Sequence, residues 1–515
     1  MEPKHPPRGI SHEDLSSGER PEHAKLRPNE LNREALKELF AASGDVNLHL
    51  FYDQDDAPSG PNPLLIYCDG MIDSAQLNDF MFRELPCLLA GDSDQGKASN
   101  AKLPLRPRNL HRIEGRDAVD NLIQQVFSGN LALFFEETQE IHVIHMAAPP
   151  QRGTDESNTE ISIKGPRDGF TEAIETNIAL VRKRLKSPTM GVNYFHIGAR
   201  SVTSVALLYM TDITNADLLD EARRRLSKIE IDGVLSSQLF EEALADSSYS
   251  LFPLIEYMGR PDYIAAGLLR GRFAIVVDGS PMVLMAPSNI MILLKSPEDM
   301  HLPFYYVALE RLLRLIGLII AIFFPGFWVA ISAYNLDQIP FPLLATIVVS
   351  RLGLPLSGPV DLFLMIALFE LFREAGMRLP KAVGQTVAVV GGLIVGEAAI
   401  SAGLTSPTTL VVTAITAVAT FTLVNQSLSG AVTCIRLFVL TVSCLFGMLG
   451  FFLSVFLLVV YLSSLTSFGI PFLSPISPFR FKEAMFALLK FPKNRYKTRP
   501  GMNGPIDGTR QGENS

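Results

Sequence analysis

Hydrophobic and polar positions follow one pattern up to Pro303 and another beyond it. In residues 1–303, short apolar segments alternate with amphipathic stretches, the pattern of ordinary soluble strands and helices. Beyond Pro303, apolar residues continue for twenty or more positions at a time, the length that crosses a bilayer. The pattern predicts an α/β soluble N-terminal region of two subdomains, followed by an all-α polytopic membrane domain.

The first predicted subdomain covers residues 31–150. Asn32 is a typical N-cap for a helix that includes Leu36, Leu39 and Phe40. Four strands are expected, at Val46–Tyr52, Leu64–Cys68, Leu131–Phe135 and Ile141–Met146. A second helix is expected at Val119–Phe127. Residues 91–115 are polar and basic with little periodicity, which predicts a long loop. Residues 1–30, rich in proline, are expected to be a disordered tail.

The second predicted subdomain covers residues 160–297, after a polar linker at 148–158. Apolar residues recur at helical spacing from Phe170 to Leu185, which predicts one amphipathic helix. Further elements are expected as strands at 161–164, 202–210 and 274–277 and a helix at 216–226. Alternation of strands and helices predicts an α/β fold here as well.

The predicted transmembrane domain, residues 304–470, contains four to six helices. A first span follows Pro303, and a segment at 341–372 is interrupted by Pro355 and Pro359. Further spans are expected at Gly384–Ala402, Thr408–Val424 and Leu437–Leu465, the last of which would be about 43 Å long as one helix. Five crossings would leave the basic tail, residues 480–515, outside the cell, contrary to the positive-inside rule. The topology of residues 341–372 stays open.

Composition sharpens this division. Residues 304–515 contain 15 basic and 9 acidic residues, so residues 1–303 account for a charge of −14 within the total of −8. Between Ala382 and Phe479 only Glu397 and Arg436 are charged. The acidic soluble part argues against nucleic-acid binding, which needs a basic surface. The four cysteines show no zinc spacing, and no secretory signal opens the chain, so the soluble part is expected in the cytoplasm.

Motifs for catalysis or metal binding are weak. Residues 91–98 approach a P-loop, but Ala98 replaces the Ser or Thr that would bind Mg²⁺. His142 and His145 point to opposite faces of a strand because they are three positions apart. Three Asp-Gly pairs, beginning at Asp69, Asp232 and Asp278, follow apolar segments and are read as turns. We therefore expect no enzyme, no cofactor and no metal site.

Charges within the predicted spans are the better functional clue, because burying them is costly. Glu397 and Glu370 are candidates for a pore or ion path, together with the polar Gln385. Glu397 can equally be a helix-end residue that reaches the headgroups, and Arg436 an interfacial anchor. Small residues on the third span, Gly391, Gly392 and Gly396, would permit close helix packing or line a pore.

Several blocks of sequence resemble one known family. Gly165, Pro166, Arg167, Gly169 and Phe170 open a block that continues through Asn177 to Leu185 and is similar to the hallmark of the A subunits of spore germinant receptors, the GerA family. Further similar segments are 230–233, 250–253, 260–262, 271–274, 296–299, 373–380 and 467–472. The resemblance covers roughly residues 31–490.

The resemblance implies a multi-pass protein of the spore inner membrane, with its N-terminal domain in the spore core. It implies a B subunit, a transporter-like nutrient binder, and a C subunit lipoprotein as partners. It also implies self-association, as a pentamer, into a nutrient-gated ion channel without catalytic residues. The alternatives are a secondary transporter, favoured by the interrupted helix, and a membrane-tethered enzyme, disfavoured by the absence of a site motif.

Overall fold

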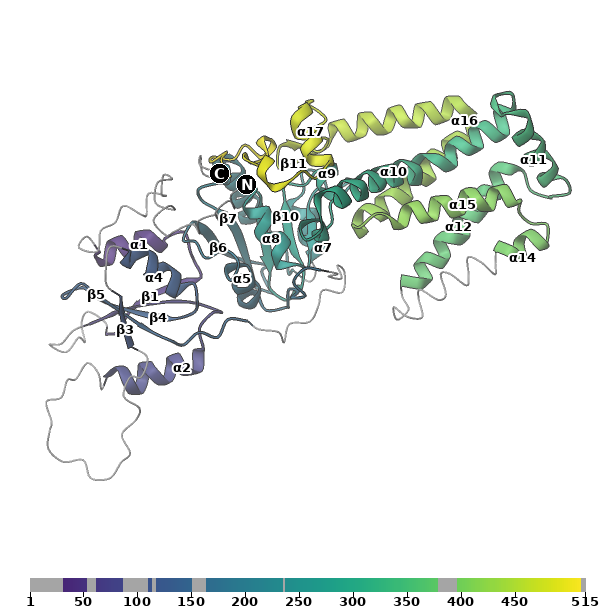
Figure 1. The fold of residues 1–515 in the computed structure, drawn as a ribbon. Helices are drawn as coiled ribbons and strands as arrows, with labels where there is room; N and C mark the ends of the chain where they lie inside the picture. Colours follow the sequence, from purple (N-terminus) through teal and green to yellow (C-terminus); the bar gives the residue numbers. More distant parts are fainter. Residues whose placement is uncertain are drawn as a thin grey trace, which may run out of the picture. The chain divides into compact units, whose positions relative to one another are not determined.

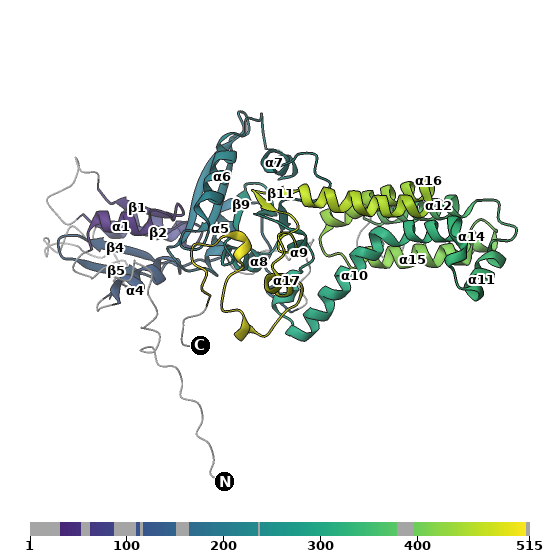
Figure 2. The ribbon, with the colours of Figure 1, turned by 90° about the horizontal axis from the view of Figure 1, so that it is seen from above.

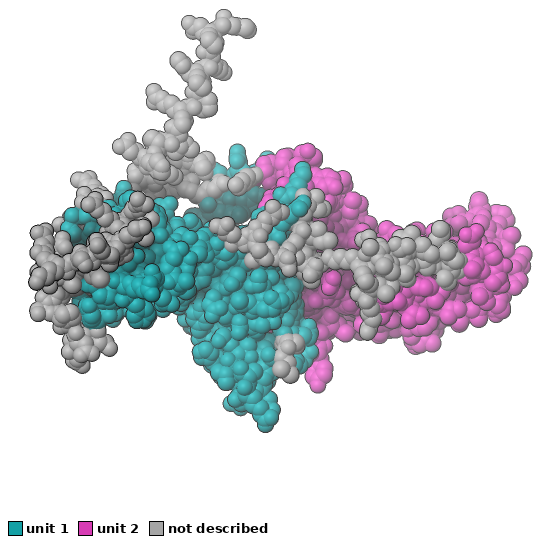
Figure 3. Space-filling view, turned by 90° about the horizontal axis from the view of Figure 1, so that it is seen from below, with its two compact units in different colours: residues 1–244, 257–287, 493–515 teal, residues 245–256, 288–492 magenta. Residues whose placement is uncertain are grey.

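The computed structural model describes residues 31–52, 62–86, 110–113, 117–150, 164–234, 237–377 and 396–510. The chain forms two compact units, coloured separately in Figure 3. Unit 1 comprises residues 1–244, 257–287 and 493–515, and unit 2 comprises residues 245–256 and 288–492. The chain therefore returns to unit 1 after it has built unit 2. The predicted disordered tail, the P-loop-like segment and residues 161–163 of the strand predicted at 161–164 lie outside the described residues.

The first half of unit 1 contains an antiparallel five-stranded sheet in the order β1-β2-β4-β5-β3. Its strands are β1 (Val46–Leu50), β2 (Leu64–Cys68), β3 (Leu110–Ile113), β4 (Leu131–Phe135) and β5 (Glu140–Ile144). The four predicted strands are confirmed. The predicted loop at 91–115 is wrong at its end, because residues 110–113 pair with β5 as an edge strand.

Helices cover both faces of this first sheet (Figure 1). On one face, α1 (Arg33–Phe40) and α4 (Ala118–Val126) pack against alternate strand residues such as Ile66 and Phe134. On the other face, α2 (Ser74–Asp79) and the π-helical turn η3 (Phe80–Glu84) pack against Leu65 and its neighbours. The Asn32 side chain accepts a hydrogen bond from the Ala35 amide, which confirms the predicted N-cap.

The second half of unit 1 contains another five-stranded sheet, in the order β6-β7-β9-β10-β8. Its strands are β6 (Met190–Ile197), β7 (Thr203–Met210), β8 (Glu256–Met258), β9 (Phe273–Val277) and β10 (Val283–Ala286). Its helices are α5 (Ile174–Arg182), α6 (Ala216–Ser227), α7 (Ser237–Leu244) and α8 (Pro261–Leu268). The strands predicted near 202–210 and 274–277 and the helix near 216–226 are confirmed, whereas β6 was not predicted.

Helix α5 is shorter than the predicted helix from Phe170 to Leu185. Two side chains explain the later start. The Asp278 carboxylate accepts a hydrogen bond from the Ile174 amide, 3.2 Å away, and so caps the helix. The Asn177 amide binds both the N–H and the C=O of Thr171, at 2.7 and 2.6 Å, which holds the preceding segment extended.

Residues 495–510 end the described chain and contact the segments that follow β7 and α8 in unit 1. The Ile506 amide donates to the Ile213 carbonyl at 2.9 Å. The Asn503 amide and the Arg499 guanidinium donate to the carbonyls of Arg270 and Leu269, which follow the last residues of α8. Side-chain donors thus satisfy carbonyls that the end of a helix leaves free. We call residues 495–510 the C-terminal strap.

Unit 2 is helical. Its long helices are α10 (Phe304–Val329), which continues as the π-helical segment η5 (Ala330–Tyr334), α12 (Gly358–Met377), α15 (Pro407–Phe421) and α16 (Gln426–Ser464). These helices lie side by side in both ribbon views (Figures 1 and 2). Shorter elements are α9 (Ile290–Leu293), α11 (Phe341–Arg351), α14 (Gly396–Ser401), the β11–β12 pair (Thr466–Ser467 with Ile470–Pro471) and α17 (Phe481–Leu488). The fold class is confirmed: an N-terminal region of sheets and helices precedes a helical part with apolar helices.

Helix α16 reverses direction at Gly447, whose φ of 60° and ψ of −137° are not helical. The residues before Gly447 follow α10 in parallel: Val439 lies against Gly326, and Gly447 itself lies against Tyr334. The residues after Gly447 run back, since the Phe451 ring lies 5.5 Å from that of Phe327. The predicted single span at Leu437–Leu465 is therefore wrong. Two helical segments, 426–446 and 448–464, form a hairpin.

Among the described residues, two helices are long and apolar enough to cross a membrane, Phe304–Tyr334 and Gln426–Ser464, the second being the hairpin just described. The interruption predicted between residues 341 and 372 is present, because α11 ends at Arg351 and α12 begins at Gly358. Helix α15 has 15 residues, close to the span predicted there. Most of the third predicted span, at 384–402, lies outside the described residues.

Candidate functional site

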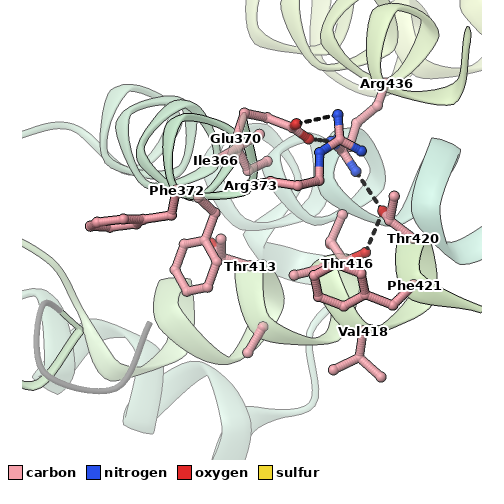
Figure 4. A pocket seen from close by; sticks show the side chains of 13 residues that line it. Ile366, Glu370, Phe372, Arg373, Thr413, Thr416, Val418, Thr420, Phe421 and Arg436 are labelled. Carbon is pink, nitrogen blue, oxygen red and sulfur yellow. Dashed lines mark hydrogen bonds and ion pairs between the residues drawn. The ribbon is translucent and has the colours of Figure 1, made fainter. Parts of the chain in front are cut away.

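The interior of unit 2 contains a cluster of charged side chains, the Glu370 cluster, formed by Glu370, Arg373 and Arg436 (Figure 4). The Glu370 carboxylate forms ion pairs with Arg373, at 2.6 Å, and with Arg436. Arg436 is 2% exposed and donates a further hydrogen bond to the Thr420 hydroxyl at 2.9 Å. The cluster thereby joins α12, α15 and α16. Removal of the partly exposed Glu370 would leave the Arg436 charge buried without its ion pair, which is costly.

A row of threonines lines the inner face of α15. Thr409, Thr413, Thr416 and Thr420 recur every three or four residues, and each is at most 4% exposed. The last three hydroxyls donate to backbone carbonyls four residues earlier in the helix, at 2.7–2.9 Å. The row satisfies its own polar groups while presenting oxygen atoms to the bundle interior.

A cavity of about 210 Å³ lies beside the Glu370 cluster. Its polar lining comes from Glu370, Arg373, Arg436 and the α15 threonines, and the rest is apolar, with phenylalanine rings at positions 369, 372 and 421 (Figure 4). The Nε atoms of Arg373 and Arg436 are buried and have no hydrogen-bond partner among the described residues. The cavity therefore combines apolar walls with an excess of cationic donors.

At the opposite end of α12 and α15, Asp361 is 2% exposed. It accepts a hydrogen bond from the Thr409 hydroxyl at 2.7 Å and lies 3.4 Å from the Ser406 amide at the start of α15. The N-terminus of a helix favours a negative charge, which offsets part of the cost of burying this carboxylate. Together with the Glu370–Thr420 end, this contact shows that α12 and α15 run in the same direction.

A second charged cluster fixes the start of α10. Asp299, 2% exposed, accepts from Arg311 at 2.7 Å and from Arg314 at 2.9 Å. Lys490 donates to the Asp299 carbonyl, and Arg314 also pairs with Glu310. The resulting ring of charges marks the end of the apolar part of the helix, where basic residues suit the cytoplasmic side of a membrane.

In unit 1, a buried ion pair connects the two sheets. Arg182, at the end of α5, is 0% exposed and donates to Asp45, 2% exposed, which precedes β1. The guanidinium also lies 4.4 Å above the Phe127 ring. The Cys68 thiol donates to the same carboxylate at 3.4 Å, and burial, reinforced by Asp45, raises the pKa of this thiol well above its usual range. We call these four residues the Asp45 latch.

Of the predicted ion-path residues, the structure describes Glu370 and Glu397, which lie on different helices. Glu397 lies exposed in the first turn of α14, and Gly396 beside it is buried against Leu410. Glu370 is engaged by two arginines and is not a free carboxylate. Gln385, Gly391 and Gly392 lie outside the described residues.

Residues of the predicted signature block have structural roles that the contacts reveal. Asn177 is fully buried and holds Thr171, as described above. Phe170 is 7% exposed and its amide binds the Gly259 carbonyl. Gly169 is buried, whereas Pro166 and Arg167 are exposed and Gly165 is half-buried.

The two histidines and two of the three Asp-Gly pairs behave as the sequence indicated, whereas Gly233, which follows Asp232, does not have a positive φ. His142 contacts Glu140 and His145 contacts Asn130, so they do not converge. Gly70 and Gly279 have φ values of 70° and 79°, which suit the turns predicted there. Among the described residues, no group of three or more metal-ligating side chains occurs.

Sequence reasoning missed the most heavily engaged charges. Arg436 was taken for an interfacial anchor, but it lies ten residues inside α16 and is buried. Asp45 and Arg182 are 137 positions apart, so nothing local revealed their pairing. The available signal for Arg436 was its isolation, as one of two charges between residues 382 and 479.

Comparison with known proteins decides the family. The model of the Bacillus/Clostridium GerA spore germination protein matches residues 34–502. The chain belongs to the GerA family. This assignment confirms the resemblance drawn from the signature block, and the matched residues include the latch, the Glu370 cluster and half of the strap.

Several relatives of this GerA protein are similar along nearly their whole length. Spore germination protein XA of Bacillus anthracis is 42% identical over 452 residues, 88% of this chain and 92% of the relative. Spore germination protein KA of Bacillus subtilis is 32% identical over 87% of this chain and 82% of the relative. The crystal structure of the N-terminal domain of the A subunit of the Bacillus megaterium spore germinant receptor GerK3 matches half of this chain and 94% of its own, at 25% identity and a TM-score of 0.34.

Proposed function

We propose that this GerA protein is the A subunit of a spore germinant receptor, which converts nutrient binding into germination. The observation that carries the proposal is the similarity to spore germination proteins over residues 34–502. The A-subunit role is the one that the block at residues 165–185 implies, through its resemblance to the A subunits of germinant receptors. The partners would be a transporter-like B subunit that binds the nutrient and a C subunit lipoprotein.

The proposed location is the spore inner membrane, with unit 1 in the spore core. Residues 493–515 return to unit 1, so residues 288–492 would cross the membrane an even number of times. The hairpin at Gly447 would cross the membrane twice, whereas the single long span predicted there would cross it once. Since α12 and α15 run in parallel, a further crossing is required between them, and the span predicted at 384–402 would supply it. The basic tail then obeys the positive-inside rule.

The proposed mechanism is an oligomeric ion channel, a pentamer, gated by the nutrient-bound partner. Support comes from the polar interior of unit 2, where charges and hydroxyl groups are buried at a cost of several kcal/mol that helix packing alone would not require. Glu397 remains the proposed ion-path residue because it is exposed and, among the described residues, forms no hydrogen bond or ion pair. Glu370 instead holds α12 to α16, and Gln385 and the glycines at 391 and 392 remain proposals.

The channel proposal is tested with the purified receptor in planar bilayers. The mass of the solubilised complex should correspond to several A subunits, and nutrient should evoke cation currents. Glu397→Gln should lower cation selectivity, because a carboxylate attracts cations into a pore. The matched control is Asp337→Asn, an exposed acid of the same unit, which should leave selectivity unchanged. A monomeric A subunit would refute the channel.

A secondary transporter is the alternative, favoured by the interruption between α11 and α12, since broken helices often form substrate sites in transporters. The distinguishing measurement is transport against a gradient in proteoliposomes. A channel passes ions only down their gradient, whereas a transporter accumulates substrate. Uphill uptake by the complex, dependent on this chain, would replace the channel proposal.

A further inference from the structure

The cavity beside the Glu370 cluster contains more positive than negative charge. Among the described residues that line it, two are cationic, Arg373 and Arg436, and one is anionic, Glu370. Glu374 is a neighbouring acid, but it is exposed and does not line the cavity. Arg436 is 98% buried, and its Nε has no hydrogen-bond partner among the described residues. A buried donor of this kind costs free energy until an acceptor reaches it.

The walls of the cavity indicate that its ligand also has an apolar part. Apart from the cluster and the threonine row they are apolar, and Val418 and Phe421 on α15 are 64% and 66% exposed at the cavity. Helices that carry such side chains on an outer face meet hydrocarbon in a bilayer. The cavity therefore fits an amphiphile with one anionic group and an apolar body.

The depth of the cavity in the membrane further restricts which amphiphile could bind there. The end of α15 packs against Gly317 of α10, three residues after Arg314 of the charged ring. At 1.5 Å per residue, this end of the cavity is about 5 Å from the charged end of the helix. The threonine row extends from there for about 10 Å, from Thr420 back to Thr413. In a membrane, this range covers the boundary between headgroups and acyl chains.

We propose that this cavity binds an anionic phospholipid of the core-facing leaflet, with Arg436 and Arg373 as the groups that bind its phosphate. The acyl chain lies along the phenylalanine side of α12 and α15. Basic pockets between membrane helices on the cytoplasmic side are suited to such headgroups. The bound lipid bridges α12, α15 and α16, so its presence stabilises the arrangement that the Glu370 cluster holds. This proposal rests on the membrane placement proposed above.

The test uses the full-length protein in nanodiscs of phosphatidylcholine that contain a minority of phosphatidylglycerol. Native mass spectrometry measures the lipids retained after release from the disc. The wild type should retain phosphatidylglycerol above its share in the disc. Arg436→Gln should lower this enrichment roughly fivefold, since a basic residue near the surface contributes about 1 kcal/mol to anionic lipid binding.

Two further variants separate the cavity from general effects of charge. Ala417→Trp fills the cavity without changing any charge and should abolish the enrichment even if the Arg436 variant does not fold. Arg351→Gln is the matched control: Arg351 is half-buried in the same unit, also has an unpartnered Nε, and does not line the cavity. The control should retain the lipid as the wild type does. Equal enrichment in Ala417→Trp and wild type would overturn the proposal.

A competition arm identifies the source of the anion. Laurate, a free carboxylic acid, is added to two kinds of disc. One contains phosphatidylglycerol, and the other contains phosphatidylcholine alone. Displacement of laurate by phosphatidylglycerol supports the lipid, whereas laurate binding that phosphatidylglycerol does not reduce would overturn it. The readout requires neither nutrient nor partner subunits. Failure of the receptor proposal in germination assays would therefore not change the lipid result, and failure of the lipid proposal would not change the germination result.

Discussion

The Asp45 latch gives the sharpest energetic prediction for unit 1. Asp45→Ala removes the carboxylate that pairs with Arg182, and both side chains are at most 2% exposed. Removal of one partner from a buried ion pair costs about 3–5 kcal/mol, because the remaining charge stays desolvated. An opening equilibrium between the two sheets should therefore rise by at least about two orders of magnitude, at 1.4 kcal/mol for each factor of ten.

Cys68 provides the assay, since its thiol is 0% exposed and lies in the latch. With the other three cysteines replaced by alanine, alkylation of the full-length protein in detergent reports how often the latch opens. Asp45→Ala should accelerate alkylation about a hundredfold or more. Rates are compared at two pH values, because loss of Asp45 also lowers the pKa of Cys68, whereas alkylation through opening follows the pKa of an exposed thiol.

Two controls make this prediction refutable. Asp168→Ala breaks the partly exposed pair with Arg184 and should change the rate less than about fivefold, because exposed pairs contribute about 0–1 kcal/mol. The double variant Asp45→Leu, Arg182→Met replaces the buried pair by apolar groups and should return most of the protection. If Asp45→Ala is no faster than Asp168→Ala, or the double variant is as fast as Asp45→Ala, the reasoning fails.

Three other changes have defined outcomes. Gly447→Ala should destabilise unit 2 by about 1–3 kcal/mol, because φ is 60° and a Cβ would lie 2.8 Å from Tyr334. The control Gly430→Ala lies in the same helix, where a Cβ meets nothing within 4 Å, and should be neutral or stabilising. Unfolding of both variants is followed by the fluorescence of the single tryptophan. Arg499→Ala should release the C-terminal strap, seen as lost hydrogen-exchange protection of the Ile506 amide; unchanged protection would contradict the assigned contacts. The raised pKa of Cys68 means that the folded chain binds the thiol proton more tightly than the unfolded chain, so stability should fall as pH rises above the ordinary thiol pKa, and Cys68→Ala should remove that part of the decline in alkaline urea titrations.

The sequence predicted those elements whose signal is local. Asn32 identified the start of α1 because capping depends on neighbouring amides, and alternation identified β1. The Gly447 reversal was not predictable in the same way, because apolar residues continue on both sides of it and a glycine within an apolar run also suits helix packing. Long-range contacts distinguish the hairpin from one long helix: Gly447 meets Tyr334, 113 positions earlier, and Phe451 meets Phe327.

The candidate site shows the same limit. The rarity of charge beyond residue 382 drew attention to Glu397 and Arg436, and that part of the reasoning was physical. Which acid Arg436 meets depends on how α12 and α16 pack, and Glu370 is 66 positions away. A single sequence without an alignment contains no record of that pairing, nor of the Asp45–Arg182 pair.

The most direct test of the receptor proposal uses Bacillus spores that lack their own germinant receptors. This chain is supplied together with its B and C subunits, and K⁺ in the medium is followed after addition of a mixture of amino acids, nucleosides and sugars. We predict rapid K⁺ release that requires all three subunits. Release of equal rate and extent from spores with only the B and C subunits would contradict the account.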